Sequence, residues 1–249
     1  MRQLRNIVVG VKPGAQESHP LGMASELATR ARARVTRLSV TDLSSRGPGV
    51  APALPDRVTG VTALGIPAIE IARQADSGGA DLIVLGRELP TGTAPRDGRD
   101  TVEGTVRRAR VPCLLVPRGK KAFRRVLAAV DGGPDSEQVV AAARLVGQLF
   151  HAAVRALHVE EPVAAGIDGR AWSHESAPSA RHWAPEGECD TISGQGDPVS
   201  EIIRVVREDS VDLLVVGHHR GGPVSAHATS GVAARLLQRV PCAVLTVPI

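Results

Sequence analysis

The chain has 249 residues, a formal net charge of +4 and 43% hydrophobic residues, but only 2% aromatic residues and no tyrosine. Its core must therefore consist of Val, Leu, Ile and Ala, which is typical of parallel strands buried on both faces. The lack of aromatic rings argues against a base-stacking surface for single-stranded nucleic acid. No apolar run is long enough for a transmembrane helix, and the N-terminus enters a predicted strand directly, without a signal peptide. We expect a cytoplasmic protein whose three cysteines, Cys113, Cys189 and Cys242, are reduced.

Taken in chain order, the predicted strands and turns form two similar sets. The first set comprises RNIVVGVKPG (5–14), ARVTRLSV (33–40), ALGIPAIEIA (63–72), ADLIVLG (80–86) and RVPCLLVP (110–117). The second comprises RVLAAVDGG (125–133), AAVRALHV (152–159), GQGDPVSEII (194–203), VDLLVVG (211–217) and RVPCAVLTVP (239–248). Such collinear self-similarity indicates a duplicated domain. We expect a first domain over 1–118, a basic linker over 119–125 and a second domain over 126–249.

Within each copy, short β-branched runs alternate with amphipathic stretches, a pattern that predicts βαβ units. A helix is expected over 136–150, and another begins at Pro198, where a first helical turn tolerates proline. The predicted fold is α/β: two tandem open five-stranded parallel sheets with helices on both faces. The apolar last strands, CLLVP and CAVLTVP, would be exposed edges, so we expect them to pair with each other and dock the domains as a pseudo-dimer.

Two other features of the chain have more than one interpretation. Segments 44–57 and 161–188 are rich in Pro, Gly, Ser and Ala and are predicted to be loops; the second contains Trp172 and Trp183, which either pin the loop or belong to a lid. Charge is also uneven. Residues 1–118 carry 17 basic and 11 acidic groups, whereas 126–249 carry 9 basic and 15 acidic groups. Opposite charge favours docking of the two halves, while a basic patch is also typical of nucleic-acid binding.

The candidate ligand site is in the second copy. In parallel α/β sheets, ligands bind outside the carboxyl ends of the strands. The first predicted strand ends at Val130, followed by Asp131 and two glycines, and the second ends at Val159. Gly196 precedes a helix, and Gly217 precedes a loop that runs into another helix. Backbone amides of such a loop and of a helix N-terminus can hold phosphate.

These residues resemble the universal stress protein family, whose members often occur as tandem domains. The resemblance covers essentially the whole chain. It is carried by VDGG after the first strand, by G-x-P before the second main helix, by D-L-[IL]-V-[LV]-G, and by V-P-C-x-[LV] in the last strand. In nucleotide-binding members, the Asp after the first strand contacts adenine, and a Gly-x-x-Gly, nine residues, then Gly-Ser/Thr holds ribose and phosphates. The resemblance therefore implies stress-related regulation and an ATP or AMP site.

Carried over residue by residue, the family motif is altered in the second copy. Asp131 and Gly217 are kept, Arg220 stands at the second glycine, and Ser230-Gly231 reverses the closing pair. Gly221 and Gly222 would restore the loop after a one-residue shift, Arg220 could supply a charge to phosphate, and Ser230 could instead be a plain helix N-cap. The predicted nucleotide-binding residues are Val130, Asp131, Val159, Gly196, Gly217, Arg220, Gly221, Gly222, Ser230 and Gly231.

The first copy departs further from the motif. Lys12 replaces the Asp, which places a cation where the exocyclic amine of adenine needs an acceptor, and Leu89 stands at the second glycine. We expect the first copy to be a non-binding structural partner.

Several alternatives stay open. One is a ligand-free interaction scaffold, with a homodimer or another protein as partner. A second is an AMP-forming enzyme, because the string from Asp131 to Ser136 resembles the Ser-Gly-Gly-x-Asp-Ser loop of ATP pyrophosphatases. No nucleophile–base constellation is visible, so catalysis beyond weak ATP hydrolysis is not expected. A metal site at His218, His219 and His227 is a further interpretation, although their spacing fits no tight ligand motif.

Overall fold

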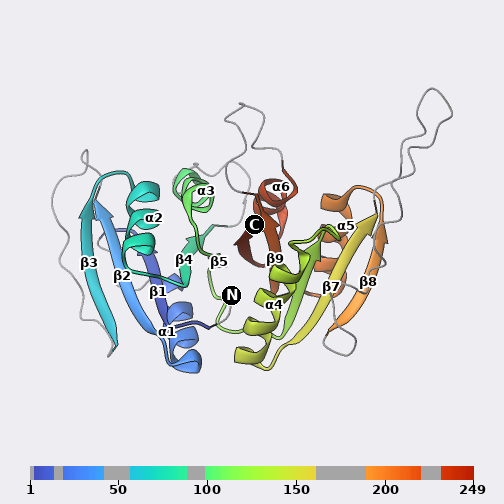
Figure 1. The fold of residues 1–249 in the computed structure, drawn as a ribbon, viewed down its shortest axis with the longest axis horizontal. Helices are drawn as coiled ribbons and strands as arrows, with labels where there is room; N and C mark the ends of the chain where they lie inside the picture. Colours follow the sequence, from blue (N-terminus) through green and yellow to red (C-terminus); the bar gives the residue numbers. More distant parts are fainter. Residues whose placement is uncertain (1–2, 14–18, 42–56, 89–98, 161–188, 220–230) are drawn as a thin grey trace.

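A computed structural model describes residues 3–13, 19–41, 57–88, 99–160, 189–219 and 231–249 (Figure 1). The first half of the chain consists of β1 (Asn6–Val11), α1 (His19–Ala31), β2 (Arg34–Thr41), β3 (Val58–Leu64), α2 (Pro67–Ser77), β4 (Leu82–Arg87), α3 (Arg99–Arg108) and β5 (Cys113–Pro117). The second half consists of β6 (Arg125–Val130), α4 (Ser136–Phe150), β7 (Ala153–Glu160), β8 (Asp190–Gln195), α5 (Pro198–Glu208), β9 (Leu213–His218), α6 (Val232–Arg239) and β10 (Ala243–Pro248). No helix in these ranges is long and apolar enough to cross a membrane.

The ten strands form one continuous sheet in the order β3-β2-β1-β4-β5-β10-β9-β6-β7-β8. Neighbours within each half are parallel, while β5 and β10 pair antiparallel, with Leu114 opposite Leu245. The predicted tandem α/β fold and the pairing of the last strands are therefore confirmed. Because each of these strands supplies the missing neighbour of the other, neither half has an open edge in the middle of the molecule.

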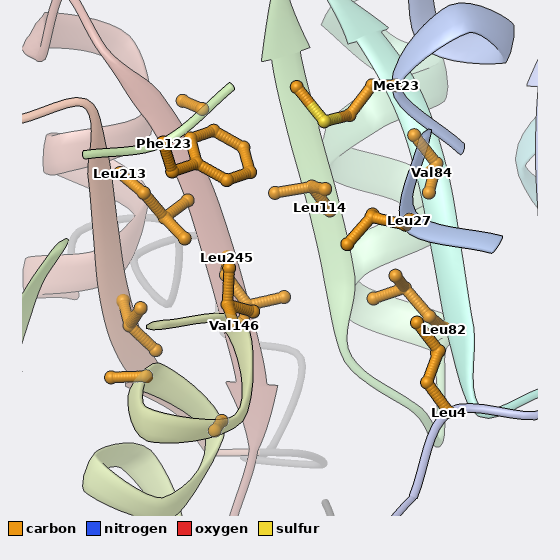
Figure 2. Packing of buried hydrophobic residues seen from close by; sticks show 14 of the residues in the cluster. Leu4, Met23, Leu27, Leu82, Val84, Leu114, Phe123, Val146, Leu213 and Leu245 are labelled. Atoms are coloured by element: carbon orange, nitrogen blue, oxygen red, sulfur yellow. The ribbon is translucent and has the colours of Figure 1, made fainter. Parts of the chain in front are cut away.

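Helices cover both faces of the sheet (Figure 1). On one face, α1 and α4 contribute to a single apolar cluster that extends across both halves. Figure 2 shows Leu114 from the first half and Leu245 from the second in this cluster, together with Phe123 from the segment that connects the halves. On the other face, the halves have separate clusters, one under α2 and α3 and one under α5 and α6. One face therefore has a shared core, and the two halves depend on each other for burial.

The connection between the halves is packed against the molecule. Phe123 is 1% exposed, and its ring meets that of Phe150 edge-on with the ring centroids 5.0 Å apart. Lys120 forms an ion pair of 2.7 Å with Asp212. Arg125, the last residue of the predicted linker, is the first residue of β6. The segment thus contributes both an apolar anchor and a charged contact to the second half.

Charged side chains of the first half also reach the second half. Nη1 of Arg30 donates to the carbonyl oxygen of Leu149 at 2.9 Å, and the guanidinium lies 4.7 Å from the centre of the Phe150 ring. Arg87 donates to the carbonyl oxygens of Val240 and Cys242 at 2.8 and 3.0 Å. The uneven composition suggested that the halves dock through side chains of opposite charge. These two arginines instead bind carbonyl oxygens and an aromatic ring of the second half.

Candidate functional site

The strand register of the second half brings several predicted residues to one edge of the sheet. Val130, the last residue of β6, lies opposite His158 of β7, and Ala129 lies opposite Val216 of β9. Gly217 therefore sits beside the end of β6 on one side, and Val159 follows His158 on the other. Strand β7 extends one residue beyond the predicted end, to Glu160, whose carbonyl oxygen accepts from the backbone N–H of Gly196 at 3.0 Å.

The turn after β6 is built around the side chain of Asp131. Its Oδ1 accepts hydrogen bonds from the backbone N–H of Gly133 at 2.8 Å and from the hydroxyl of Ser136 at 3.1 Å. Gly132 has φ +79°, a conformation that L side chains rarely adopt. The turn ends at Ser136, the first residue of α4. Oδ1 of Asp131 thus fixes the turn. The residue as a whole is exposed to solvent.

His158 is a residue of this edge that sequence reasoning missed. Its Nδ1 lies 3.2 Å from the carbonyl oxygen of Val130, so in the tautomer with a protonated Nδ1 it donates to the end of β6. A Cβ on Gly132 would lie 3.1 Å from Cε1 of His158. The φ of Gly132 favours glycine, and a Cβ there would also need the imidazole to shift slightly. The signal was available: aligning the predicted strands β6 and β7 in parallel register places His158 beside Val130.

A second turn of this edge contains Gly196, with φ +115°, followed by Asp197, the N-cap of α5. Oδ2 of Asp197 accepts from the hydroxyl and the backbone N–H of Ser200 at 2.7 and 3.0 Å, and Arg235 of α6 lies 3.4 Å from Oδ1. The hydrogen bonds from Ser200 lower the pKa of Asp197, and the charge of Arg235 acts in the same direction. Arg235, also missed from the sequence, places a cation between this turn and α6.

The N-terminus of α6 lies where the family motif would close. Gly231 is the N-cap, with φ −61° and ψ 155°, and its carbonyl oxygen accepts from the N–H of Arg235 at 3.1 Å. Ser230, considered as an N-cap, lies outside the described residues, as do Arg220, Gly221 and Gly222. The structure therefore places both ends of the predicted phosphate loop, Gly217 and Gly231, but not its middle.

Gly217 is closely packed. A Cβ there would lie 2.8 Å from Cδ1 of Ile249 and 3.3 Å from Cγ2 of Val139. Ile249 is held by a 3.0 Å hydrogen bond from its N–H to the carbonyl oxygen of His218. The described residues contain no group of three or more His, Cys, Asp or Glu side chains placed to hold a metal ion; of the histidines considered above, His227 lies outside them.

The first half presents different groups at the matching positions. Lys12 is exposed after β1, where the second half has Asp131. A Cβ on Gly86 would lie 2.8 Å from the imidazole of His19, whose Nε2 is 2.9 Å from the carbonyl oxygen of Val116. Burial lowers the pKa of His19, and it is the largest influence on this group. The predicted Leu89 lies outside the described residues. This edge thus carries a cation and a half-buried imidazole, not a carboxylate turn.

Comparison with known proteins decides the family. The model of the universal stress protein family matches residues 122–248, just over half of the chain. The chain belongs to the universal stress protein family. A search of curated proteins gives no match to this sequence.

Solved structures of similar fold extend over both halves of this universal stress protein. One, from Pseudomonas aeruginosa UCBPP-PA14 and assigned to the universal stress proteins, is 16% identical, with a TM-score of 0.72, and the match covers 99% of this chain and 94% of that one. A universal stress protein from Archaeoglobus fulgidus DSM 4304 is 14% identical, with a TM-score of 0.69, covering 99% and 97%. At these identities the likeness shows the fold, and it shows it for the tandem arrangement as a whole.

Proposed function

We propose that this protein acts in a stress response as a regulatory binding protein, and that its second half binds an adenine nucleotide, ATP or AMP. The observation that carries the proposal is the ordered turn at the carboxyl end of β6, in which Oδ1 of Asp131 holds Gly133 and Ser136 in place. A carboxylate fixed in this way is a preorganised acceptor. Adenine presents an exocyclic amine, a donor that matches it.

Chemical contrast between the halves supports restricting the site to the second half. Lys12 and Asp131 occupy matching positions, but an ammonium group has donors only and cannot accept from an amine. We propose that residues 1–118 are a structural partner, that 119–125 connect the halves, and that 126–249 form the binding domain of a cytoplasmic protein.

The remaining predicted residues would contact the rest of the nucleotide, as their positions indicate. Val130, Val159 and Gly196 would line the adenine and ribose side. Gly217 and Gly231 would begin and end the phosphate loop, with Arg220, Gly221, Gly222 and Ser230 between them. Arg235, which already lies near the N-terminus of α6, adds a positive charge there. A helix N-terminus and a nearby guanidinium both favour a phosphate anion.

The test is a calorimetric titration of ATP, AMP and cyclic AMP into the purified full-length protein. The decisive variant is Asp131→Asn, because asparagine keeps the oxygen that accepts from Gly133 but offers the ligand an amide in place of a carboxylate. Since a hydrogen bond to a charged group contributes about 1.5–3 kcal/mol, affinity should fall about tenfold or more. Lys12→Ala is the matched control in the first half and should leave affinity unchanged.

Each result has a distinct meaning. Failure of the wild-type protein to bind any of the three nucleotides would overturn the proposal and favour a ligand-free scaffold. Binding that Asp131→Asn leaves intact but Lys12→Ala removes would move the site to the first half. Release of pyrophosphate from ATP would instead support the AMP-forming enzyme.

A further inference from the structure

At the opposite end of the first half from its carboxyl edge, the surface contains a hollow of about 570 Å³. It lies where α1 ends and where β1 and β2 begin. Its lining residues are Gln3, Arg5, Asn6, Ala31, Arg32 and Arg34. A volume of this size lies within the range of about 300–1,000 Å³ that is typical of small-molecule sites.

The charge of this hollow is one-sided. Three of its lining residues are arginines, and none is acidic. The guanidinium of Arg5 donates to the neutral oxygen Oε1 of Gln3 at 3.0 and 2.7 Å. Among the described residues, the ion pairs involve none of the three arginines. The nearby Asp81 directs Oδ2 to the backbone N–H groups of Arg5 and Asn6, at 2.8 and 2.9 Å.

The second half shows that the fold does not require two of these arginines, Arg32 and Arg34. The backbone of the turn is the same in both halves: Arg32 has φ +56° and His151, at the matching position, has φ +54°. The N–H of Arg34 donates to the carbonyl oxygen of Arg5 at 2.7 Å. In the second half, the N–H of Ala153 donates to the carbonyl oxygen of Arg124 at 2.9 Å. The turn thus tolerates His151 and Ala153 in place of Arg32 and Arg34, whereas Arg124 matches Arg5. The two additional positive charges of the first half therefore have no structural cause in the turn.

We propose that this hollow binds an oligophosphate, a compact anion with two or more linked phosphate groups. A planar guanidinium group binds phosphate through two parallel hydrogen bonds, and three arginines line this hollow. Gln3 adds a neutral amide, while the amide of Asn6 already donates to the carbonyl oxygen of Gly79 at 3.2 Å. Fixed like charges around a concave surface also concentrate anions from solution. The site is separate from the proposed nucleotide site, which lies on the other half and depends on Asp131.

The test uses calorimetric titration of inorganic tripolyphosphate into the full-length protein at low ionic strength, with orthophosphate in parallel. We expect one tripolyphosphate per chain and much weaker binding of orthophosphate. The Arg32→Gln/Arg34→Gln variant should lose about tenfold or more in affinity, since two of the charged donors are gone. Both side chains are exposed, and circular dichroism checks that the variant is folded.

The matched control is Arg73→Gln/Arg110→Gln, which removes the same charge from two side chains that are 69% and 74% exposed and pair with Glu70 and Asp76. It should bind like the wild type. Equal losses in both double variants would show attraction by net charge alone and overturn the site, as would no loss in the Arg32→Gln/Arg34→Gln variant. Arg32→Lys/Arg34→Lys keeps the charge without the planar fork and should bind at an intermediate level.

A further arm distinguishes the sources of the phosphates. ATP is titrated into the Asp131→Asn protein, with and without Arg32→Gln/Arg34→Gln. ATP binding that is lost only with the arginines identifies the triphosphate of a nucleotide as a ligand of the hollow. Tripolyphosphate binding without such ATP binding identifies a free oligophosphate.

Discussion

Arg87 offers the sharpest test of how the two halves are held together. It is the last residue of β4 and 5% exposed, and its guanidinium reaches 153 and 155 residues along the chain to the carbonyl oxygens of Val240 and Cys242. These carbonyls lie at the end of α6 and just before β10. Replacement of Arg87 by methionine keeps an unbranched side chain there but removes both donors. The two carbonyls would then be buried without these hydrogen bonds.

The expected magnitude is a difference between two opposing terms. Hydrogen bonds from a charged donor contribute about 1.5–3 kcal/mol each, or about 3–6 kcal/mol for the pair. Against this, burial lowers the pKa of Arg87 to about 10, so the cost of keeping the guanidinium charged in the interior offsets part of that gain. We expect Arg87→Met to lower the free energy of unfolding by about 1–3 kcal/mol, and Tm by about 4–8 °C for a loss of 2 kcal/mol.

The assay is urea denaturation followed by circular dichroism, together with a thermal scan. Arg73→Met is the control, because Arg73 is 69% exposed and pairs with Glu70 on the surface; it should change stability by less than about 0.5 kcal/mol. Arg87→Lys should not restore the wild-type value, since an ammonium group lacks the fork that bridges two carbonyls. An Arg87→Met protein as stable as the Arg73→Met protein would show that the hydrogen bonds of Arg87 do not hold the two halves together.

Three further predictions concern buried side chains. Phe123→Ala removes a ring that is 1% exposed and packed edge-on against Phe150 between the halves, so it should cost about 3–5 kcal/mol by the same urea assay; a loss below about 1 kcal/mol would contradict a shared core. Burial raises the pKa of the Cys113 thiol to about 12 and that of Cys242 to about 11, so in the folded protein near neutral pH only the half-buried Cys189 should react with a thiol reagent, and Cys189→Ser should be unreactive until denatured. Because unfolded thiols release protons near pH 9.0 while these two retain theirs, stability should fall as pH rises from 9 to about 10, and Cys113→Ala should reduce that fall.

Much of the candidate site could be predicted from the sequence because its residues follow the ends of apolar strands. A strand end, a glycine and a carboxylate are local signals, so Asp131, Gly196 and Gly217 could be placed at one edge without coordinates. His158 and Arg235 could not be found in the same way. His158 belongs to the edge through its register with Val130, and Arg235 through an approach of α6 to the α5 turn.

By itself, the sequence determined the duplication, the parallel strands and the pairing of the two last strands. These follow from periodicity and from the need of an apolar edge for a partner, which are properties of short segments. Only the tertiary structure decided which groups cross between the halves. Arg87 and Phe123 act at a junction created by the antiparallel pairing of β5 with β10, and the hollow at Arg32 and Arg34 depends on where α1 ends against β1. Such contacts join residues far apart in the chain, so no local pattern encodes them.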